Sequence, residues 1–388
     1  MFKCNVLAVS ISLAALCAAQ AAMADINGGG STLPQPLYQT AGVLTAGFAP
    51  YIGVGSGKGK LAFLNNDYSQ FVPGVINKNV HWAASDSKLT AAELSTYRAN
   101  HGEAWGPLIQ VPAAATSIAI PFNKAGAAAV DLSINALCGV FSGRLTQWDQ
   151  IPSSGRTGNL TVVYPAQSSG TTELFTRVLN AKCNETGRFS VTTNFAASYS
   201  GGLPVGAVGA ITSQGVMDAM NAADGRITFM SPAYAASTLA GLDDATKVAR
   251  VAGVSPAPAN IAAAIATVAP PAVSDRLNPN AWVPVFAATS NPLDPSVVPY
   301  PSSGYPILGF TNLIFSQCYA DATETAQVRA FFARHYGALV SNNVAINNNR
   351  LVPLPVYWKN AVRETFITAA SGLSIGNPNV CTGLGRPL

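Results

Sequence analysis

Short apolar runs alternate along this chain with longer amphipathic stretches, and each pattern predicts its own kind of element. Runs rich in β-branched and aromatic residues, bounded by Gly, Pro or Asn, predict strands at 117–122, 160–164, 226–230 and 305–315. Apolar positions spaced three or four apart predict helices at 171–180, 325–336 and 357–368. Strands that alternate with helices predict an α/β chain whose sheets are covered on both faces.

The first apolar run has a different character. It extends over residues 6–22, follows Lys3, and ends in small residues just before Asp25. This is the pattern of a secretory signal, so we expect residues 1–24 to be removed and the mature protein to be periplasmic or secreted. A membrane anchor is the alternative, but polar residues interrupt the run and no stop-transfer charges follow it. We expect no membrane span in the mature chain.

Length and charge limit the remaining possibilities. Residues 25–388 suffice for two ordinary domains with a large core. Only 10% of all residues are charged, the net charge is +4, and the basic residues are scattered. This distribution argues against a nucleic-acid-binding surface.

Four cysteines remain after the predicted signal peptide. An even number in an exported chain favours disulfides, and proximity in the sequence predicts the pairs Cys138–Cys183 and Cys318–Cys381. A metal site is the alternative, but none of these cysteines has C-x-x-C spacing. Between residues 252 and 301 the chain is rich in Pro and Ala, which predicts an ordered surface excursion or a partial linker.

Three stretches combine glycine with hydroxyl residues where a helix can begin. "GGGSTLPQPLY" contains Thr32, "GVGSGKGK" contains Ser56, and "SSGTTELF" contains Ser169, Gly170 and Thr171. Unpaired backbone N–H groups at a helix start, together with a hydroxyl, can hold an oxyanion without a full opposing charge. Each stretch alone is also explained as a simple helix cap.

Nucleotide-binding motifs do not account for the second stretch. A phosphate-binding loop would need glycine at Val54 and a hydroxyl residue at Leu61, and the G-x-G-x-x-G spacing is not met from Gly53 or Gly55.

"HWAASDSK" adds one acidic residue, Asp86. A carboxylate can accept the proton that hydrogen phosphate carries, whereas sulfate near neutral pH carries none, so an aspartate in an anion site would distinguish the two ions. The alternative is a turn or cap residue.

These residues also carry a family resemblance. The segment that begins "DINGGGSTLPQPLYQTAGVLTAGFAPYIGVGSGKGKLAFLNND" resembles the DING family of phosphate-binding proteins, and the similarity continues through "VHWAASDSKL", "ALCGVFSGRLTQWDQIP", "SSGTTELFTR", "GYPILGFTNLIFSQCY" and "GLGRPL". It covers essentially all of residues 25–388. The family is in turn similar to the phosphate-binding subunits of ABC importers.

The resemblance implies a periplasmic-binding-protein type II fold, with two α/β lobes joined by a two-crossover hinge. Lobe I would comprise residues 25–112 plus 308–388, and lobe II residues 113–307, with crossovers near Val111–Pro112 and near 305–310. It further implies a monomer without a cofactor that binds inorganic phosphate and delivers it to an ABC importer.

The resemblance also implies the phosphate ligands. Thr32 and Leu33 would supply a hydroxyl and a backbone N–H, Ser56 a second hydroxyl, and Asp86 the acceptor for the phosphate proton. Ser169, Gly170 and Thr171 would enclose the other side of the ion. No metal ligand and no catalytic residue is expected.

One stretch departs from the family pattern. The family usually has an arginine directly after the tyrosine of "VVY", where it contacts phosphate and pairs with the aspartate, but this chain has Pro165; it also has Gln167 where an acidic residue is usual. Three outcomes are open: substitution by Lys58, Lys60 or Lys88, weaker phosphate binding, or preference for another oxyanion or a phosphate ester.

Two other functions remain as alternatives. Some DING relatives are described as phosphatases, and Ser87, Ser169 or Thr171 could be nominated as nucleophile of an alkaline phosphatase-like phosphomonoesterase. The three histidines, His81, His101 and His335, have no metal-binding spacing, however, and His81 is interpreted as a packed residue. An extracellular adhesion or interaction protein is the third possibility, compatible with the Asn-rich "SNNVAINNNR".

Overall fold

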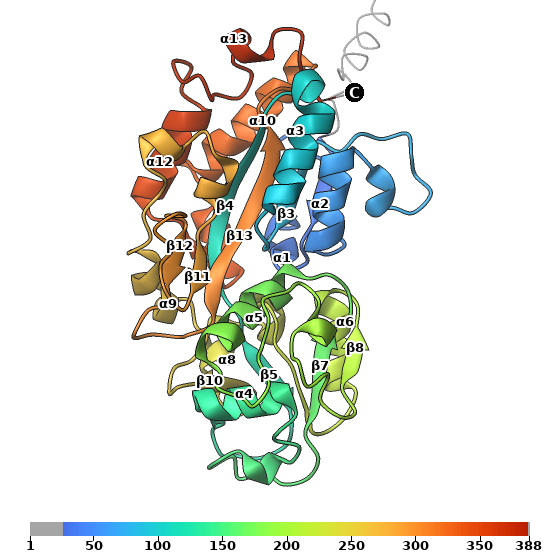
Figure 1. Ribbon diagram of the computed structural model, residues 1–388, viewed down its shortest axis with the longest axis vertical. Helices are drawn as coiled ribbons and strands as arrows, with labels where there is room; N and C mark the ends of the chain where they lie inside the picture. Colours follow the sequence, from blue (N-terminus) through green and yellow to red (C-terminus); the bar gives the residue numbers. More distant parts are fainter. Residues whose placement is uncertain (1–25, 387–388) are drawn as a thin grey trace, which may run out of the picture.

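The computed structural model describes residues 26–386, which form two lobes stacked along the long axis (Figure 1). The predicted signal peptide lies outside the described residues. The first lobe contains a six-stranded mixed sheet in the order β14 (Val352–Pro353), β4 (Leu108–Ser117), β13 (Leu308–Ser316), β3 (Trp82–Ser85), β1 (Gly28–Gly30) and β2 (Ile52–Gly53). Its helices are α1 (Gln35–Tyr38), α2 (Ser56–Asn65), α3 (Ala91–Trp105), α10 (Ala322–His335), α11 (Asn343–Asn348), α12 (Val356–Phe366) and α13 (Pro378–Cys381).

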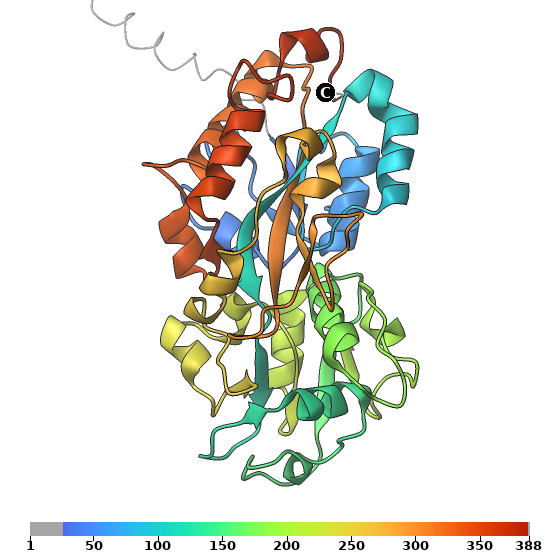
Figure 2. The ribbon, with the colours of Figure 1, turned by 60° about the vertical axis from the view of Figure 1, so that its left-hand side comes forward.

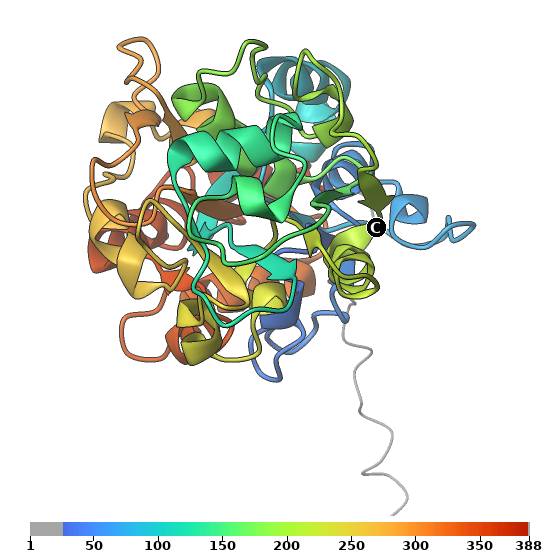
Figure 3. The same ribbon diagram turned by 90° about the horizontal axis from the view of Figure 1, so that it is seen from below.

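The second lobe contains another six-stranded mixed sheet. Its strand order is β6 (Asp131–Leu132), β10 (Val248–Val251), β5 (Ile120–Asn123), β9 (Arg226–Ile227), β7 (Thr161–Pro165) and β8 (Val208–Ala210). The helices of this part are α4 (Ile134–Ser142), α5 (Gly170–Lys182), α6 (Thr212–Asn221), α7 (Pro232–Ala235) and α8 (Leu239–Asp243). Figure 3 views this lobe from below, with the segment around α4 nearest the reader.

Two long antiparallel strands connect the lobes. Strands β4 and β13 run side by side along the first lobe (Figure 2), and β4 continues directly into β5 of the other sheet. The chain leaves the first sheet at Ile118, whose N–H donates to Ile307, and Ala119 already pairs with Met230 of the second lobe. The predicted strand 117–122 is therefore divided between two sheets. Strands β7 and β13 and helices α5, α10 and α12 begin and end within three residues of their predicted bounds.

The Pro- and Ala-rich segment is folded. It contains α9 (Ala259–Ile265) and a two-stranded sheet of β11 (Val285–Ala287) and β12 (Val297–Pro299). Its contacts include the first lobe, because the indole N–H of Trp358 in α12 donates to Val268 and the side chain of Gln110 in β4 donates to Asn280. The predicted lobe bounds, 25–112 plus 308–388 and 113–307, stay a prediction.

Aromatic side chains fill the core of both lobes. In the first lobe Trp82 stacks on Phe315 with 5.5 Å between ring centroids. In the second lobe Phe175 stacks on Phe229 at 4.3 Å. These side chains are fully buried, and at about 1.5 to 3 kcal/mol for each large apolar side chain they contribute strongly to stability.

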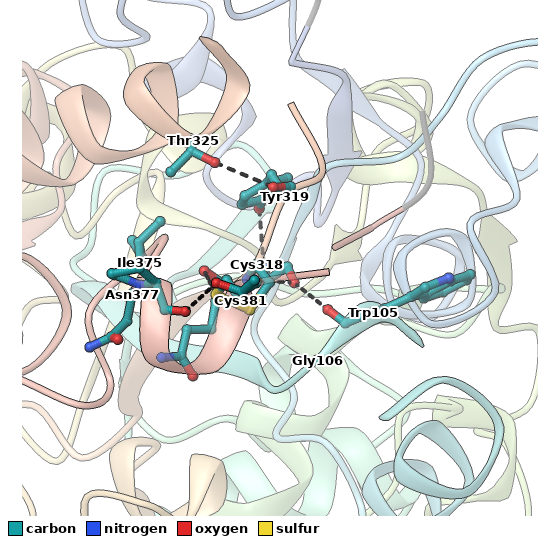
Figure 4. Close-up of a disulfide and its surroundings, with 12 residues drawn as sticks. Trp105, Gly106, Cys318, Tyr319, Thr325, Ile375, Asn377 and Cys381 are labelled. Carbon is teal, nitrogen blue, oxygen red and sulfur yellow. Dashed lines mark hydrogen bonds between the residues drawn. A yellow bond between two sulfur atoms is a disulfide. The ribbon is translucent and has the colours of Figure 1, made fainter. Parts of the chain in front are cut away.

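Both predicted disulfides are present. Cys138–Cys183 joins α4 to the residue that follows α5, and Cys318–Cys381 joins the end of the long hinge strand to α13 (Figure 4). The second pair lies beside Trp105 and Gly106 (Figure 4), and α13 lies at the end of the first lobe away from the second lobe (Figure 1).

Replacing both Cys318 and Cys381 with alanine is expected to lower the free energy of unfolding by about 2 to 4 kcal/mol, because the bond closes a loop of 63 residues in the unfolded chain. Urea unfolding of the oxidised protein and the double variant measures the difference. An unchanged midpoint and slope would contradict the expectation.

Candidate functional site

A small pocket lies where the two lobes meet. Residues from both lobes line it: Ser31, Thr32, Gly55 and Ser56 from the first, and Pro165, Gln167, Ser169, Thr171, Thr212, Ser213, Val216, Phe229 and Met230 from the second. The seven of these residues that carry a hydroxyl group form the hydroxyl wall of the pocket, and Pro165, Val216, Phe229 and Met230, all from the second lobe, form its apolar wall.

Three helices begin at this pocket. Helix α2 starts at Ser56, directly after Gly55; α5 starts at Gly170, with Ser169 as its N-cap; and α6 starts at Thr212. The first N–H groups of a helix have no partner within it, and they form the positive end of the helix dipole. Gly55 has φ 97°, a conformation that glycine adopts without strain but other residues rarely adopt. The backbone before α2 therefore favours glycine at this position.

Hydroxyl groups connect the lobes across the pocket. The Oγ1 of Thr32 lies 2.7 Å from the Oγ of Ser213, at hydrogen-bonding distance, and it accepts a hydrogen bond from the Ser213 N–H at 3.2 Å. Thr212, the preceding residue, has φ 59°, which is strained for a β-branched side chain. The start of α6 is thus held in an unusual conformation against the other lobe.

Asp86 lies directly behind the hydroxyl wall. Its Oδ2 accepts hydrogen bonds from the Ser31 hydroxyl at 2.5 Å and the Thr171 hydroxyl at 3.5 Å, and its N–H donates to the Ser56 hydroxyl at 3.1 Å. The other carboxylate oxygen, Oδ1, is buried and has no partner within residues 26–386. Burial raises the pKa of Asp86 to about 6, although the neighbouring hydroxyls favour its charged form and oppose this shift.

The raised pKa of Asp86 has a consequence for stability. A carboxyl whose pKa is higher in the folded protein contributes stability at low pH that is lost as the pH rises through about 6. The variant Asp86→Asn, which carries no charge, should therefore be more stable than the parent at pH 8, by on the order of 2 kcal/mol.

Thermal unfolding of phosphate-free Asp86→Asn and parent protein between pH 4 and 8 measures this effect. The difference should shrink as the pH falls below about 6. A variant that is less stable than the parent at pH 8 would contradict it.

The residues predicted for the site from three separate stretches lie together. Thr32, Ser56, Ser169 and Thr171 line the pocket, and Asp86 contacts two of its hydroxyl residues. Gly170 packs against Ser56 and Asp86, where a Cβ atom would lie 2.5 Å from the Ser56 Oγ. Leu33 directs its N–H to the Ser31 hydroxyl at 3.1 Å.

Sequence reasoning missed the contribution of α6 and of the apolar wall. The residues concerned are Thr212, Ser213, Val216, Phe229 and Met230. "ITSQG" does contain two hydroxyl residues and a glycine at a helix start, the same signal that identified the other stretches.

Of the residues considered for catalysis, Ser169 and Thr171 line the pocket, whereas Ser87 and the histidine His81 lie outside its lining. Ser87 is fully buried, with its hydroxyl 3.0 Å from that of Ser85. His81 is a packed residue as predicted, because its ring accepts from the Asn27 N–H and contacts Glu324 at 3.0 Å. Among residues 26–386 no group of three His, Cys, Asp or Glu side chains could hold a metal ion. Within the same range no helix is long and apolar enough to cross a membrane.

Comparison with known proteins identifies relatives over the whole chain. Residues 18–332 match the PBP superfamily domain. Alkaline phosphatase L of Pseudomonas aeruginosa (strain UCBPP-PA14) is 67% identical over 100% of both chains. The structure of a high-affinity periplasmic phosphate-binding protein, PfluDING, bound with phosphate, is 67% identical, with a TM-score of 0.92 over 94% of this chain and 100% of its own.

A third relative is more distant. The structure of a phosphate-binding protein from Stenotrophomonas maltophilia is 40% identical, with a TM-score of 0.84 over 95% of this chain and 100% of its own. These matches confirm the predicted two-lobed α/β binding-protein fold. The chain belongs to the PBP superfamily and, within it, to the DING family.

Proposed function

We propose that this protein is an exported solute-binding protein that holds inorganic phosphate, as HPO4 or H2PO4, in the pocket between its lobes. One observation carries the proposal: three helix N-termini and the hydroxyl groups of both lobes surround one small pocket, backed by a buried aspartate. N–H and O–H donors arranged in this way match the oxygens of a tetrahedral anion. The relatives named phosphate-binding proteins support the same ligand.

Asp86 provides selectivity in this proposal. Its Oδ1 is buried without a partner within the described chain, and a protonated phosphate oxygen can donate to it. Sulfate has no such proton near neutral pH, so its oxygens would face the carboxylate with repulsion.

The remaining ligands follow from their places around the pocket. Thr32 and Ser56 supply hydroxyls from the first lobe, and Ser169 and Thr171 supply them from the second. The N–H groups of Leu33 and Gly170 complete the proposed set, although neither residue is among those that line the pocket and the Leu33 N–H would have to exchange the Ser31 hydroxyl for the ion. Since donors come from both lobes, closure about the hinge would remove water from the ion and complete its hydrogen bonds.

Calorimetry with the purified mature chain tests the function. We expect one phosphate site per chain, no measurable binding of sulfate, and an affinity at pH 8 weaker than nanomolar because the family arginine is replaced by Pro165. Thr171→Val should weaken phosphate binding by up to about tenfold, the loss of one hydrogen bond. Thr186→Val, which alters an exposed loop, is the matched control.

Two results would count against this proposal. Absence of phosphate and arsenate binding at millimolar concentrations would contradict the function itself. Nanomolar affinity at pH 8 would contradict only the weakening.

Delivery to an ABC importer from the periplasm or the exterior is part of the proposal, as is a monomeric state. The PBP superfamily match and the periplasmic relative support export and solute binding.

Phosphomonoester hydrolysis is the second candidate, because two relatives at 67% and 66% identity are named alkaline phosphatase L. The buried Ser87 lies outside the pocket lining, and none of the residues that line the pocket is a histidine or an acid. An assay of p-nitrophenyl phosphate hydrolysis by Asp86→Asn, Ser87→Ala and the parent protein tests this candidate. Equal activity in all three proteins would show that a contaminating phosphatase is responsible. Loss of activity in either variant would support hydrolysis by this protein.

A further inference from the structure

The pocket between the lobes is lined without a cationic side chain. None of the residues that line it is Lys, Arg or His. Lys58 is exposed on α2, Lys60 pairs with Glu93 at 3.0 Å, and Lys88 contacts Asp294 and Ser296. The three lysines that could have replaced the family arginine are therefore exposed or paired with other groups.

The wall that begins at Pro165 offers no hydrogen-bond donor from its side chains. Proline has neither an N–H nor a polar side chain, and Val216, Phe229 and Met230 continue this wall with apolar groups that are at least 98% buried. Dipoles of α2, α5 and α6 remain as the source of positive potential. Each helix N-terminus is equivalent to about half an elementary charge.

Asp86 opposes these dipoles with a negative charge. The hydroxyls of Ser31 and Thr171 contact it, and the Thr311 hydroxyl lies nearby on β13. The phenols of Tyr38 and Tyr51 also face it, and burial raises the pKa of each, so both are neutral.

Charged groups on α5 do not neutralise Asp86 either. Glu173 is close enough to raise the pKa of Asp86 further, but it is held by Arg177 at 2.7 Å. The charge of Arg177 is thereby directed to Glu173. Lys88, the other cation near this pair, contacts Asp294 instead.

A doubly charged phosphate beside an ionised Asp86 would place three negative charges against dipoles that amount to roughly one and a half positive charges. A singly charged phosphate reduces this imbalance by one full charge. We propose that the pocket preferentially binds the singly charged dihydrogen form of phosphate. The bound ligand then carries one more proton than the doubly charged form of phosphate does.

The hydrogen-bonding groups of the pocket agree with this ligand. Dihydrogen phosphate has two O–H donors and therefore needs two acceptors. The Oδ1 of Asp86, which lies behind the lining residues with only the Thr311 hydroxyl as a neighbouring donor in the described chain, is one, and the hydroxyl oxygens or the carbonyl of Gln167 can be the other. An arginine at position 165 could only donate. The inference rests on the proposed phosphate site and specifies its ligand.

Proton uptake during binding is the direct test. At pH 8.5 inorganic phosphate is almost entirely doubly charged, so binding of the dihydrogen form must take up about one proton from the buffer. Calorimetry with the parent protein in two buffers of different ionisation enthalpy counts that proton. Affinity expressed on total phosphate should also fall by at least about tenfold from pH 5.5 to pH 8.5.

Two variants test whether the residue at position 165 determines this preference for dihydrogen phosphate. Pro165→Arg should gain affinity mainly at pH 8.5 and take up less than one proton there, whereas Pro165→Ala should keep the pH dependence of the parent. Circular dichroism at each pH confirms that the proteins are folded. Because Asp86 is itself ionised at pH 8.5, the proton taken up must also be located. The 31P NMR signal of phosphate bound to the parent protein at pH 8.5 locates it: a signal typical of the dihydrogen form supports the proposal, whereas a signal typical of the doubly charged form assigns the proton to Asp86 and overturns it.

The possible results distinguish failure of the preference for dihydrogen phosphate from failure of the phosphate site itself. Binding at pH 8.5 that is as tight as at pH 5.5 and takes up no proton would overturn the preference for the dihydrogen form and leave the phosphate site intact. Absence of phosphate binding at every pH would overturn the proposed function, and this inference with it.

Discussion

Replacing Gly170 with alanine is expected to weaken phosphate binding by about 5- to 150-fold. The new Cβ would lie 2.5 Å from the Ser56 Oγ and 2.7 Å from the Asp86 Cβ, and both of these residues belong to the opposite lobe. Overpacking of this kind typically costs about 1 to 3 kcal/mol. Since the overlap arises only where the lobes meet, it opposes closure and should leave the thermal stability of the phosphate-free protein nearly unchanged.

Gly215→Ala is the matched control for this variant. Gly215 lies in α6, beside the same pocket, but the nearest atom to its added Cβ is the Thr212 Oγ1 at 3.6 Å, an ordinary contact. Calorimetry should find its phosphate affinity close to that of the parent. Equal affinities of Gly170→Ala and Gly215→Ala would contradict the close approach of α5 to α2.

Replacing Arg386 with alanine is expected to lower the free energy of unfolding by at least about 3 kcal/mol. The buried guanidinium donates to the carbonyls of Val80 at 3.0 Å and Phe63 at 2.7 Å, and it lies over the rings of Phe63 and Trp105. Each hydrogen bond from a charged donor contributes about 1.5 to 3 kcal/mol. Without Arg386 the Phe63 carbonyl keeps only the weaker bond from the Asn66 N–H, and the Val80 carbonyl loses its side-chain donor.

Urea unfolding of Arg386→Ala measures this loss. Arg386→Lys, which keeps the charge but not the planar group with its two directed donors, should be intermediate. Arg98→Ala, on the exposed face of α3, should change the free energy of unfolding by less than about 0.5 kcal/mol. An Arg386→Ala protein as stable as Arg98→Ala would contradict the anchoring role.

Local sequence patterns were sufficient to predict several elements of this fold. Helix α5 was predicted because its apolar spacing and the Ser169 cap agree, and the predicted pairs Cys138–Cys183 and Cys318–Cys381 formed. The end of β4 before Ile118 was not predictable in the same way, because the residues before and after it form one continuous apolar run. They belong to different strands only because β4 pairs with β13 in the first sheet and β5 pairs with β10 in the second.

The pocket residues predicted from the sequence are those that lie at helix starts with a nearby glycine, such as Ser56 and Ser169. The apolar wall of the pocket was not predicted, since Val216, Phe229 and Met230 are also ordinary core residues in their own elements. The absence of lysine from the pocket lining depends on pairings such as Lys60 with Glu93, between residues 33 positions apart. No local pattern encodes such a pairing.

Helix dipoles at the pocket also affect how an anion arrives. The field of a dipole fades faster with distance than the field of a point charge, so it acts within the closed pocket and hardly at all beyond the first layers of solvent. Attraction over a long range is then left to the modest net charge of +4, whose charged residues are scattered along the chain. The association rate constant for phosphate should consequently vary little with ionic strength, and discrimination among anions would take place after contact, as the lobes close.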